Sequence, residues 1–360
     1  MHRISAAITK PKRTPGLTDF RESRREMFIY RRHFAALALG TLGAMPLVRT
    51  ALAGDDTGGL HEKLRQFEAF PGTKSFRIDV GSNTVASQRA SVQLFVASAI
   101  KTFILAQYLR DVEAGHLSLD EQLPVDDGVR TINSPVLEYL TGTTLPLQGV
   151  LEAMIRFSDN TATDIALARV GPDRVRQFIA EAGLQATLIP DSTRLFFSYN
   201  VGAPLGVDIG WTGVQEVLAS KKLLGPARPP LNHQETLASS ADDLVGYYQR
   251  ALAGNFFTEP TTPAKFKFIH LTNYLFPPDT VGYAKGGNVD IPAPPSPPDL
   301  QLTADFHAIS YAGQMVVGTT PVTFCFIVNW TSPTVNSTDL EPAFAEVVSG
   351  CLEIIKQSLL

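Results

Sequence analysis

Two strand-forming regions lie far apart in this chain, and a long helical region separates them. The first, "SFRIDVGSNTVASQR" at residues 75–89, is typical of a hairpin with a Gly-Ser-Asn turn. The second contains "TVGYAKGG", "DFHAISYAGQMVVG" and "PVTFCFIVNW", which are rich in aromatic and β-branched residues. One antiparallel sheet can hold both regions. The expected fold class is therefore α/β (α+β), an antiparallel sheet flanked by terminal helices with an inserted all-helical lobe.

Apolar periodicity predicts the helices around and between these strands. "LHEKLRQFEAF" places Leu60, Leu64 and Phe67 on one face, and "DLEPAFAEVVSGCLEIIKQSL" closes the chain. Further helices are expected at "VASAIKTFILAQYL", "TTLPLQGVLEAMIRF" (N-cap Thr144), "TATDIALARVG", "PDRVRQFIAEAG" and "SSADDLVGYYQRALAG" (N-cap Ser239 or Ser240). Residues 190–235 are rich in Gly and Pro, which favours long loops with short helices.

The N-terminal segment has the pattern of an export signal. Arg31 and Arg32 precede a short apolar run, and the pattern "ALA" predicts cleavage after Ala53. The two arginines resemble a twin-arginine signal, and an ordinary secretory signal is the alternative. Residues 1–26 are unlike a signal, which makes Met27 an alternative start. We therefore expect a periplasmic or secreted protein without a stable membrane span.

Removal of residues 1–53 changes the charge of the chain. They hold 10 of the 31 Lys and Arg and 3 of the 35 Asp and Glu, so residues 54–360 keep 21 basic and 32 acidic side chains, a net charge of about −11. Such an acidic chain has no electrostatic footprint for nucleic acid or anionic lipid. We expect a monomer with a small-molecule partner. Its two cysteines, Cys325 and Cys351, are interpreted as free buried thiols, although export permits a disulfide.

Ser98 is the only serine in the chain with a lysine, Lys101, three residues later. In a helix, residues three apart share a face, so the amine can reach the hydroxyl. Serine is a weak nucleophile until a base takes its proton. Lysine serves as that base only where burial or a second cation lowers its pKa, and the apolar residues around Lys101 favour burial. The alternative is a surface lysine beside an N-cap serine.

Two further segments complete a known set of motifs. Ser158-Asp159-Asn160 follows an amphipathic helix, and Lys285-Gly286-Gly287 ends the strand "TVGYA". With Ser98 and Lys101 they resemble the S-x-x-K, S-D-N and K-T-G motifs of class A β-lactamases and penicillin-binding proteins. The similarity covers roughly residues 56–360. It implies a serine β-lactamase-like domain with an α/β lobe (56–94 and 237–360) and a helical lobe (95–236).

The resemblance implies a catalytic role for three residues. Ser98 would be the nucleophile that becomes acylated. Lys101 would accept its proton, directly or through water. Ser158 would relay a proton to the leaving nitrogen.

The resemblance also implies a substrate-binding group. Asn160 would bind Lys101 and the side-chain amide of the substrate. Lys285, in the strand end that includes Gly287, would attract the substrate carboxylate and help to keep Lys101 neutral. The backbone N–H groups of Ser98 and Asn288 would form the oxyanion hole.

The chain departs from the class A pattern at three places. Where the family has R-W-E-P-x-L-N, this chain has "RLFFSYN", which places Phe196 at the position of the glutamate that activates the hydrolytic water. Arg194 keeps its place and is expected to pair with Asp208. Asp191 and Asp208 are the nearest other carboxylates in the sequence. Gly286 lacks the hydroxyl of the family's Thr or Ser, and the loops around 205–235 and 290–300 are longer than usual.

These residues predict an exported serine hydrolase that β-lactams acylate at Ser98, with impaired deacylation because phenylalanine accepts no proton. The alternatives are a D-alanyl-D-alanine peptidase or esterase of the same superfamily, acting on a peptidoglycan-like amide or ester, and a non-catalytic binding protein on the same fold. No cofactor or metal is expected. Five histidines are scattered without metal-ligand spacing: His61, His116, His233, His270 and His307.

Overall fold

The computed structural model describes residues 47–48 and 57–360. The predicted cleavage site after Ala53 and the arginine pair of the export signal lie outside these residues. The described residues belong to one compact unit, Pro46–Leu360. The division of this unit into two lobes stays a prediction.

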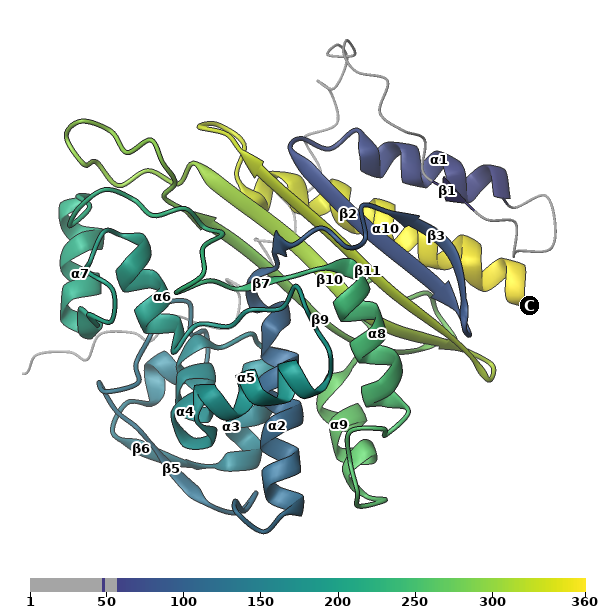
Figure 1. Cartoon of the computed structure of the whole chain (residues 1–360), viewed down its shortest axis with the longest axis horizontal. Coiled ribbons are helices and arrows are strands. Elements are labelled where there is room, and N and C mark those ends of the chain that lie inside the picture. The colour runs from purple at the N-terminus through teal and green to yellow at the C-terminus, as the bar shows by residue number, and fades with distance from the viewer. Residues whose placement is uncertain (1–46, 49–56) are drawn as a thin grey trace, which may run out of the picture. The chain divides into compact units, whose positions relative to one another are not determined.

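A seven-stranded antiparallel sheet joins the two ends of the described chain, as the sequence predicts (Figure 1). Its order is β1-β3-β2-β11-β10-β9-β8. The strands are β1 (Leu47–Val48), β2 (Thr73–Val80), β3 (Asn83–Gln88), β8 (Leu271–Thr272), β9 (Val281–Ile291), β10 (Phe306–Val317) and β11 (Thr320–Thr331). The N-terminal hairpin joins the C-terminal strands through the pairing of β2 with β11, where Phe76 lies opposite Phe326.

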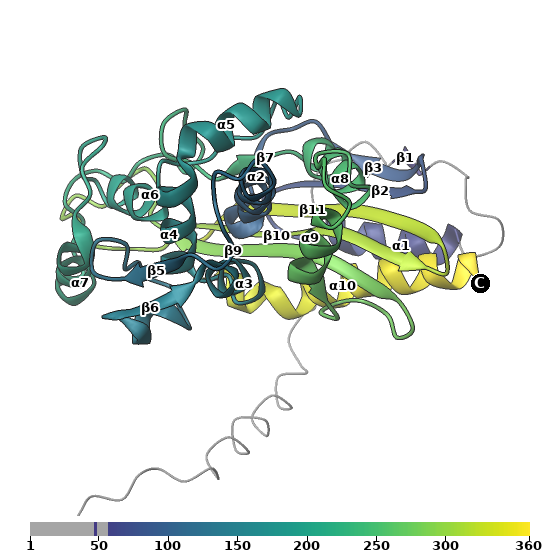
Figure 2. The ribbon, with the colours of Figure 1, turned by 90° about the horizontal axis from the view of Figure 1, so that it is seen from below.

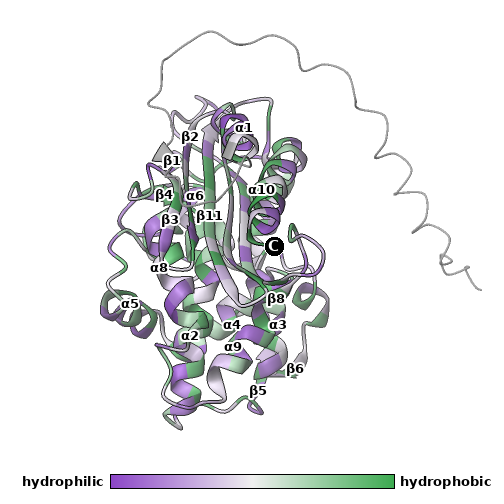
Figure 3. Ribbon diagram, turned by 90° about the vertical axis from the view of Figure 1, so that its right-hand side faces the viewer, coloured by the Kyte–Doolittle hydropathy of each residue, from purple (hydrophilic) through white to green (hydrophobic). Residues whose placement is uncertain are grey.

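Helices cover both faces of this sheet. Helices α1 (Thr57–Glu68) and α10 (Ser337–Leu359) pack together on one face, and α8 (Ala241–Leu252) lies on the other (Figure 2). Because side chains alternate along a strand, β11 sends Phe324 and Phe326 to the first face and Cys325 to the second. Helix α10 carries both hydrophobic and hydrophilic residues, as expected for a helix that buries one side (Figure 3).

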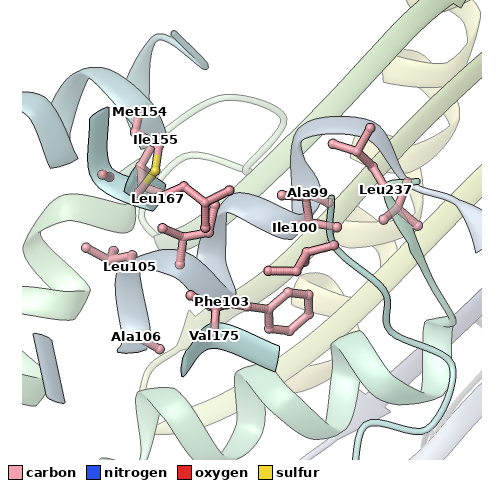
Figure 4. Close-up of a cluster of buried hydrophobic side chains, with 14 of the residues drawn as sticks. Ala99, Ile100, Phe103, Leu105, Ala106, Met154, Ile155, Leu167, Val175 and Leu237 are labelled. Carbon is pink, nitrogen blue, oxygen red and sulfur yellow. The ribbon is translucent and has the colours of Figure 1, made fainter. Parts of the chain in front are cut away.

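The remaining elements form the helical part that holds much of the site. They are β4 (Leu94–Phe95), the 3-10 turn η2 (Ala97–Ile100), α2 (Lys101–Glu113), β5 (Gln122–Val125), the 3-10 turn η3 (Leu137–Leu140), β6 (Thr143–Pro146), α3 (Leu147–Arg156), α4 (Asn160–Val170), α5 (Pro172–Glu181), α6 (Thr193–Asn200), α7 (Gly210–Ser220), β7 (Ala238–Ser239) and α9 (Thr262–His270). Helix α2 is the central one. Its Phe103 and Leu105 pack among Met154, Leu167 and Val175 (Figure 4).

Several local predictions are confirmed and two need correction. Ser240 caps α8, and the two cysteines are free and buried. Thr144 does not cap a helix, because "TTLP" forms β6 against β5 and the helix begins after Pro146. Helix α9 lies where the sequence analysis predicted no helix. No helix in the described ranges is long and apolar enough to cross a membrane.

Candidate active site

Ser98 lies at the entry to the buried central helix. It is the second residue of η2, which continues directly into α2, and its side chain is half-buried. Ala97 before it has a φ of +48°, a left-handed conformation that costs a non-glycine residue about 1 kcal/mol or more. The backbone turns sharply here, so that Ser98 faces a cleft while Ala99 and Ile100 enter the core.

Strand β9 passes very close to the backbone of Ser98. A Cβ atom built on Gly287 would lie 2.4 Å from the Ser98 amide nitrogen and 2.8 Å from the Val96 carbonyl oxygen. Real Cβ atoms do not approach that closely, so glycine is needed for this contact. The amide of Ser98 is also one of the first in its helical turn, where backbone N–H groups lack an intrahelical acceptor.

Lys101 is the first residue of α2, and none of its surface is exposed. Its Nζ lies 2.6 Å from the carbonyl oxygen of Ser158 and 2.7 Å from Oδ1 of Asn160. A neutral amine has two N–H donors and one lone pair. These two acceptors match its two donors, and the Ser158 hydroxyl oxygen, 3.4 Å away, is a third hydrogen-bond partner of the amine. Within the described part of the chain, no hydrogen bond joins Lys101 to the Ser98 hydroxyl.

Burial holds the pKa of Lys101 well below its usual value. The positive charge of Lys285 lowers this pKa further, and Asp159 and Asp164 partly oppose the shift. Desolvation is the largest cause, so the amine is neutral under conditions where a surface lysine is charged. This is the protonation state that a general base needs.

Ser158 lies between the two lysines. Its Oγ accepts a hydrogen bond from Lys285 Nζ at 3.0 Å and lies 3.4 Å from Lys101 Nζ. Burial lowers the pKa of Lys285 to about 7. Ser158 has a φ of +56°, a second left-handed residue at the site. An observed outlier of this kind is a marker of functional sites, and nothing in the serine side chain predicts it.

The two residues after Ser158 hold the neighbouring loop and α4 in place through hydrogen bonds. Asp159 is the N-cap of α4 and accepts from the Ala162 amide at 2.9 Å. Its second oxygen accepts from the amides of Val136 and Leu137, at 3.0 and 2.8 Å, which holds the loop of residues 134–136 against the helix. Asn160 is held by its Nδ2, which donates to the Ile132 carbonyl at 2.9 Å. The sequence analysis assigned Asp159 no role.

A buried carboxyl that the sequence analysis missed anchors α6. Asp164 accepts from the Thr131 hydroxyl at 2.6 Å and from the amides of Thr193 and Arg194 at 2.6 and 3.1 Å. Burial raises its pKa, and these hydrogen bonds oppose the rise. Asp164 lies four residues after Asn160, so the two share a helix face, and this spacing could have indicated from the sequence that Asp164 lies near the site.

Phe196 lies in α6 on the wall of the cleft, and 2% of its surface is exposed. Its ring packs 5.6 Å from that of Phe95 and 5.1 Å from that of Phe197, measured between centroids. Asp208 pairs with Arg194 at 2.8 Å, as expected, and Asp191 pairs with Arg176. Neither carboxylate lines the cleft among the described residues.

Two other carboxylates do line the part of the cleft that contains Ser98, and the sequence analysis named neither. Glu138 comes from η3. Asp290, near the end of β9, lies 2.6 Å from Nδ1 of buried His307 and accepts from the Ser337 amide and hydroxyl, both at 2.8 Å. Asp290 is thus engaged in joining β9, β10 and the start of α10.

The cleft has two connected chambers. The central chamber, about 620 Å³, is lined by residues that include Ser98, Ser158, Asn160, Phe196 and Asn288. A second chamber of about 530 Å³ is lined by Lys285, Gly286 and Gly287 and shares Phe157, Ser158 and Asn288 with the first. Among the described residues, no group of three or more His, Cys, Asp or Glu is arranged to hold a metal.

Comparisons with known proteins identify the family and the fold of the chain. A family model described as the beta-lactamase enzyme family matches residues 60–273, more than half of the chain. Lys285 lies beyond that range. Two curated relatives are the beta-lactamase SME-1 of Serratia marcescens, 26% identical over 110 residues, and a beta-lactamase of Rhodobacter capsulatus, 27% identical over 150 residues. These alignments cover 30% and 41% of this chain and 37% and 51% of the relatives, so the chain spans about half or less of each relative's length.

Solved structures show the same fold over most of the chain. PBP-A is 17% identical with a TM-score of 0.60, over 84% of this chain and 96% of its own. A class A beta-lactamase from Bacteroides cellulosilyticus DSM 14838 is 15% identical with a TM-score of 0.59, over 84% of this chain and 99% of its own. At these identities the likeness concerns the fold alone. The family match over residues 60–273 shows that the chain belongs to the beta-lactamase enzyme family.

Proposed function

We propose that this protein is an exported serine hydrolase that β-lactams acylate at Ser98, and that the acyl-enzyme is long-lived. One observation carries the proposal. The amine of Lys101 is buried and donates hydrogen bonds to the Ser158 carbonyl and to Asn160. Burial and the charge of Lys285 hold its pKa well below its usual value. A lysine placed in this way can act as a general base.

In this proposal, each group acts on one part of the substrate. Lys101 takes the proton of Ser98 as the hydroxyl attacks the lactam carbonyl. The amides of Ser98 and Asn288 hold the oxygen that becomes negative. Ser158, bonded to Lys285, passes a proton to the leaving nitrogen. Lys285 attracts the substrate carboxylate, and Asn160 binds the amide of the acyl side chain.

Slow release follows from the wall of the cleft beside Ser98. Phe196 presents an aromatic ring, packed against Phe95, at the place where a carboxylate would activate water. A positioned general base contributes about 10²–10⁴-fold to a rate, so its loss separates slow from efficient turnover. The same feature favours the second candidate, a D-alanyl-D-alanine peptidase or esterase that attacks a peptidoglycan-like amide or ester through Ser98.

Export and oligomeric state are part of the proposal. The predicted signal favours a periplasmic or secreted protein, twin-arginine exported, and the acidic remainder favours a monomer. Fractionation of cells that express the full chain, with Arg31→Lys and Arg32→Lys together as the variant, tests the route. Loss of the exported form in the double variant is expected, and unchanged export would contradict the twin-arginine route.

Time-resolved intact mass spectrometry with benzylpenicillin tests the proposed chemistry. We expect an adduct of one penicillin on the parent protein, and no adduct on Ser98→Ala. Ser82→Ala, an exposed turn position, is the matched control and is expected to behave as the parent. An adduct that stays for hours supports slow deacylation. If neither penicillin nor an acyl ester modifies the protein, a non-catalytic binding protein is the correct reading.

A further inference from the structure

An apolar pocket of about 410 Å³ adjoins the central chamber of the cleft. We infer that this pocket binds an extended apolar acyl side chain of the substrate. Its lining comes from the loop before η3, from α6 and α7, and from the end of β9 and the loop after it: Ile132, Asn133, Phe197, Asn200, Val201, Ile209, Val214, Val217, Leu218, Lys221, Asp290, Ile291, Pro292, Leu302, Thr303 and Ala304. The inference rests on the proposed function, because Ser98 defines which side of the substrate is the acyl side.

The segments after α7 and after β9, which belong to the two long loops of this chain, lie side by side (Figure 1). The Leu223 amide donates to the Leu300 carbonyl at 2.6 Å, and the Leu302 amide donates to the Lys221 carbonyl at 2.8 Å. The Ala227 amide donates to the Ser296 hydroxyl at 2.6 Å. These bonds tie the segment after α7 to the segment after β9. The extra length therefore forms one structure with a defined interior.

The pocket also joins the earlier elements of the site. The Leu224 amide donates to the Val201 carbonyl at 2.9 Å, which ties the first loop to the end of α6. Nδ2 of Asn200 donates to the Pro292 carbonyl at 3.1 Å, which ties α6 to the second loop. In helix α6, Phe196 thus lines the central chamber, and Phe197 lines both the central chamber and the apolar pocket.

The position of the pocket selects the acyl side of the substrate. Asn133, Phe197 and Asp290 line both the pocket and the central chamber. The chamber that contains Lys285 opens from the central chamber past Phe157, Ser158 and Asn288 instead. A substrate whose carboxylate lies at Lys285 therefore has its leaving group at that end. Its acyl side chain, held by Asn160, points toward the other opening.

The lining defines the chemistry of the side chain. Val214, Val217, Leu218, Ile209 and Phe197 offer aliphatic and aromatic surface, so the pocket suits an alkyl or aryl group. The Asp290 carboxylate at the opening is already bonded to His307 and Ser337, so the pocket does not demand a cation there. Each methylene that moves from water into such a pocket strengthens binding about fourfold.

A homologous series of penicillins, with acyl side chains from acetyl to octanoyl, tests the inference. Calorimetric titration of Ser98→Ala measures binding without acylation. We expect the affinity to rise about fourfold per methylene over the first few members. In Val217→Trp and in Val214→Phe on the same background, which fill the pocket, this rise is expected to disappear. Ala219→Trp, on the exposed side of α7, is the matched control and is expected to keep it.

The outcomes separate the inference from the proposed function. An affinity that does not depend on chain length, or a rise that persists in a folded pocket-filling variant, would overturn the acyl pocket. Val214 is only half-buried, so its variant keeps the test available if Val217→Trp does not fold. Failure of the parent to form adducts would overturn the acylation chemistry and leave the chain-length dependence to decide the pocket.

Discussion

The buried amine of Lys101 lies 2.6 Å from the carbonyl oxygen of Ser158, a residue held in a left-handed conformation. The positive φ of Ser158 places the segment so that its carbonyl and the Asn160 side chain meet the same amine. The base of the proposed reaction is therefore oriented by S-D-N, and the backbone of that motif matters as much as its side chains.

Replacing the base tests its role. Lys101→Met is expected to slow penicillin acylation about 10²–10⁴-fold, because no other group takes the Ser98 proton. It removes a desolvated amine but leaves the Ser158 carbonyl and Asn160 Oδ1 without their donor, so the melting temperature is expected to change little. Lys74→Met, at a half-buried lysine outside the cleft, is the control. An unchanged acylation rate in Lys101→Met would exclude this base.

Lys285 is expected to set the pH dependence of substrate capture. Its pKa is lowered to about 7 by burial, so the side chain is charged below that pH and neutral above it. We expect kcat/KM for penicillins to fall as pH rises above about 7, because kcat/KM reports the pKa of the free enzyme. Lys285→Arg stays charged and is expected to extend the plateau to higher pH.

A penicillin methyl ester provides the control for this profile, since it lacks the carboxylate. Its acylation is expected to lack the fall that Lys285 causes. Identical pH profiles for the acid and the ester would show that Lys285 does not recognise the carboxylate.

A carboxylate at position 196 is expected to shorten the life of the acyl-enzyme. Phe196→Glu places a general base on the wall of the cleft, and a gain of about 10²-fold or more in deacylation is expected if the side chain reaches the water. The same change buries a charge beside Phe95 and Phe197, so thermal stability is expected to fall. Phe196→Gln has the same shape without the base, and equal deacylation in both variants would contradict the argument.

The close contact of β9 with Ser98 predicts a difference between two neighbouring glycines. A Cβ at Gly287 would lie 2.4 Å from the Ser98 nitrogen, whereas one at Gly286 would lie 3.0 Å from Cδ2 of Tyr311 and 3.3 Å from the Ser310 carbonyl. Gly287→Ala is therefore expected to displace the backbone at Ser98 and to slow acylation by at least tenfold. Gly286→Ala is expected to have a smaller effect, and the reverse order would contradict the geometry.

Much of the fold follows from the sequence because its signals are local. The hairpin that becomes β2 and β3, the apolar face of Leu60, Leu64 and Phe67, and the cap at Ser240 each depend on a few adjacent residues. The prediction of an N-cap at Thr144 was wrong because Thr144 pairs with a strand residue 20 positions earlier, so its segment is a strand and the helix begins later.

The parts of the site that were missed depend on tertiary contacts. The hydrogen bonds of Asp164 reach Thr131 and Thr193, some 30 residues away on either side. The sequence analysis identified the two long loops, but their mutual pairing at Leu223 and Leu300 has no local signature. Motif order gave the candidate residues, and only the structure gave the direction of the Lys101 amine.

Nuclear magnetic resonance of protein with ¹³Cε- and ¹⁵Nζ-labelled lysine tests the central claim most directly. The Lys101 signal is assigned by its loss in Lys101→Met, and its shift is followed with pH. The arrangement described here predicts that Lys101 becomes a neutral amine at a lower pH than the exposed lysines, because burial and Lys285 lower its pKa. A Lys101 signal that stays in the ammonium form up to pH 9 would contradict it.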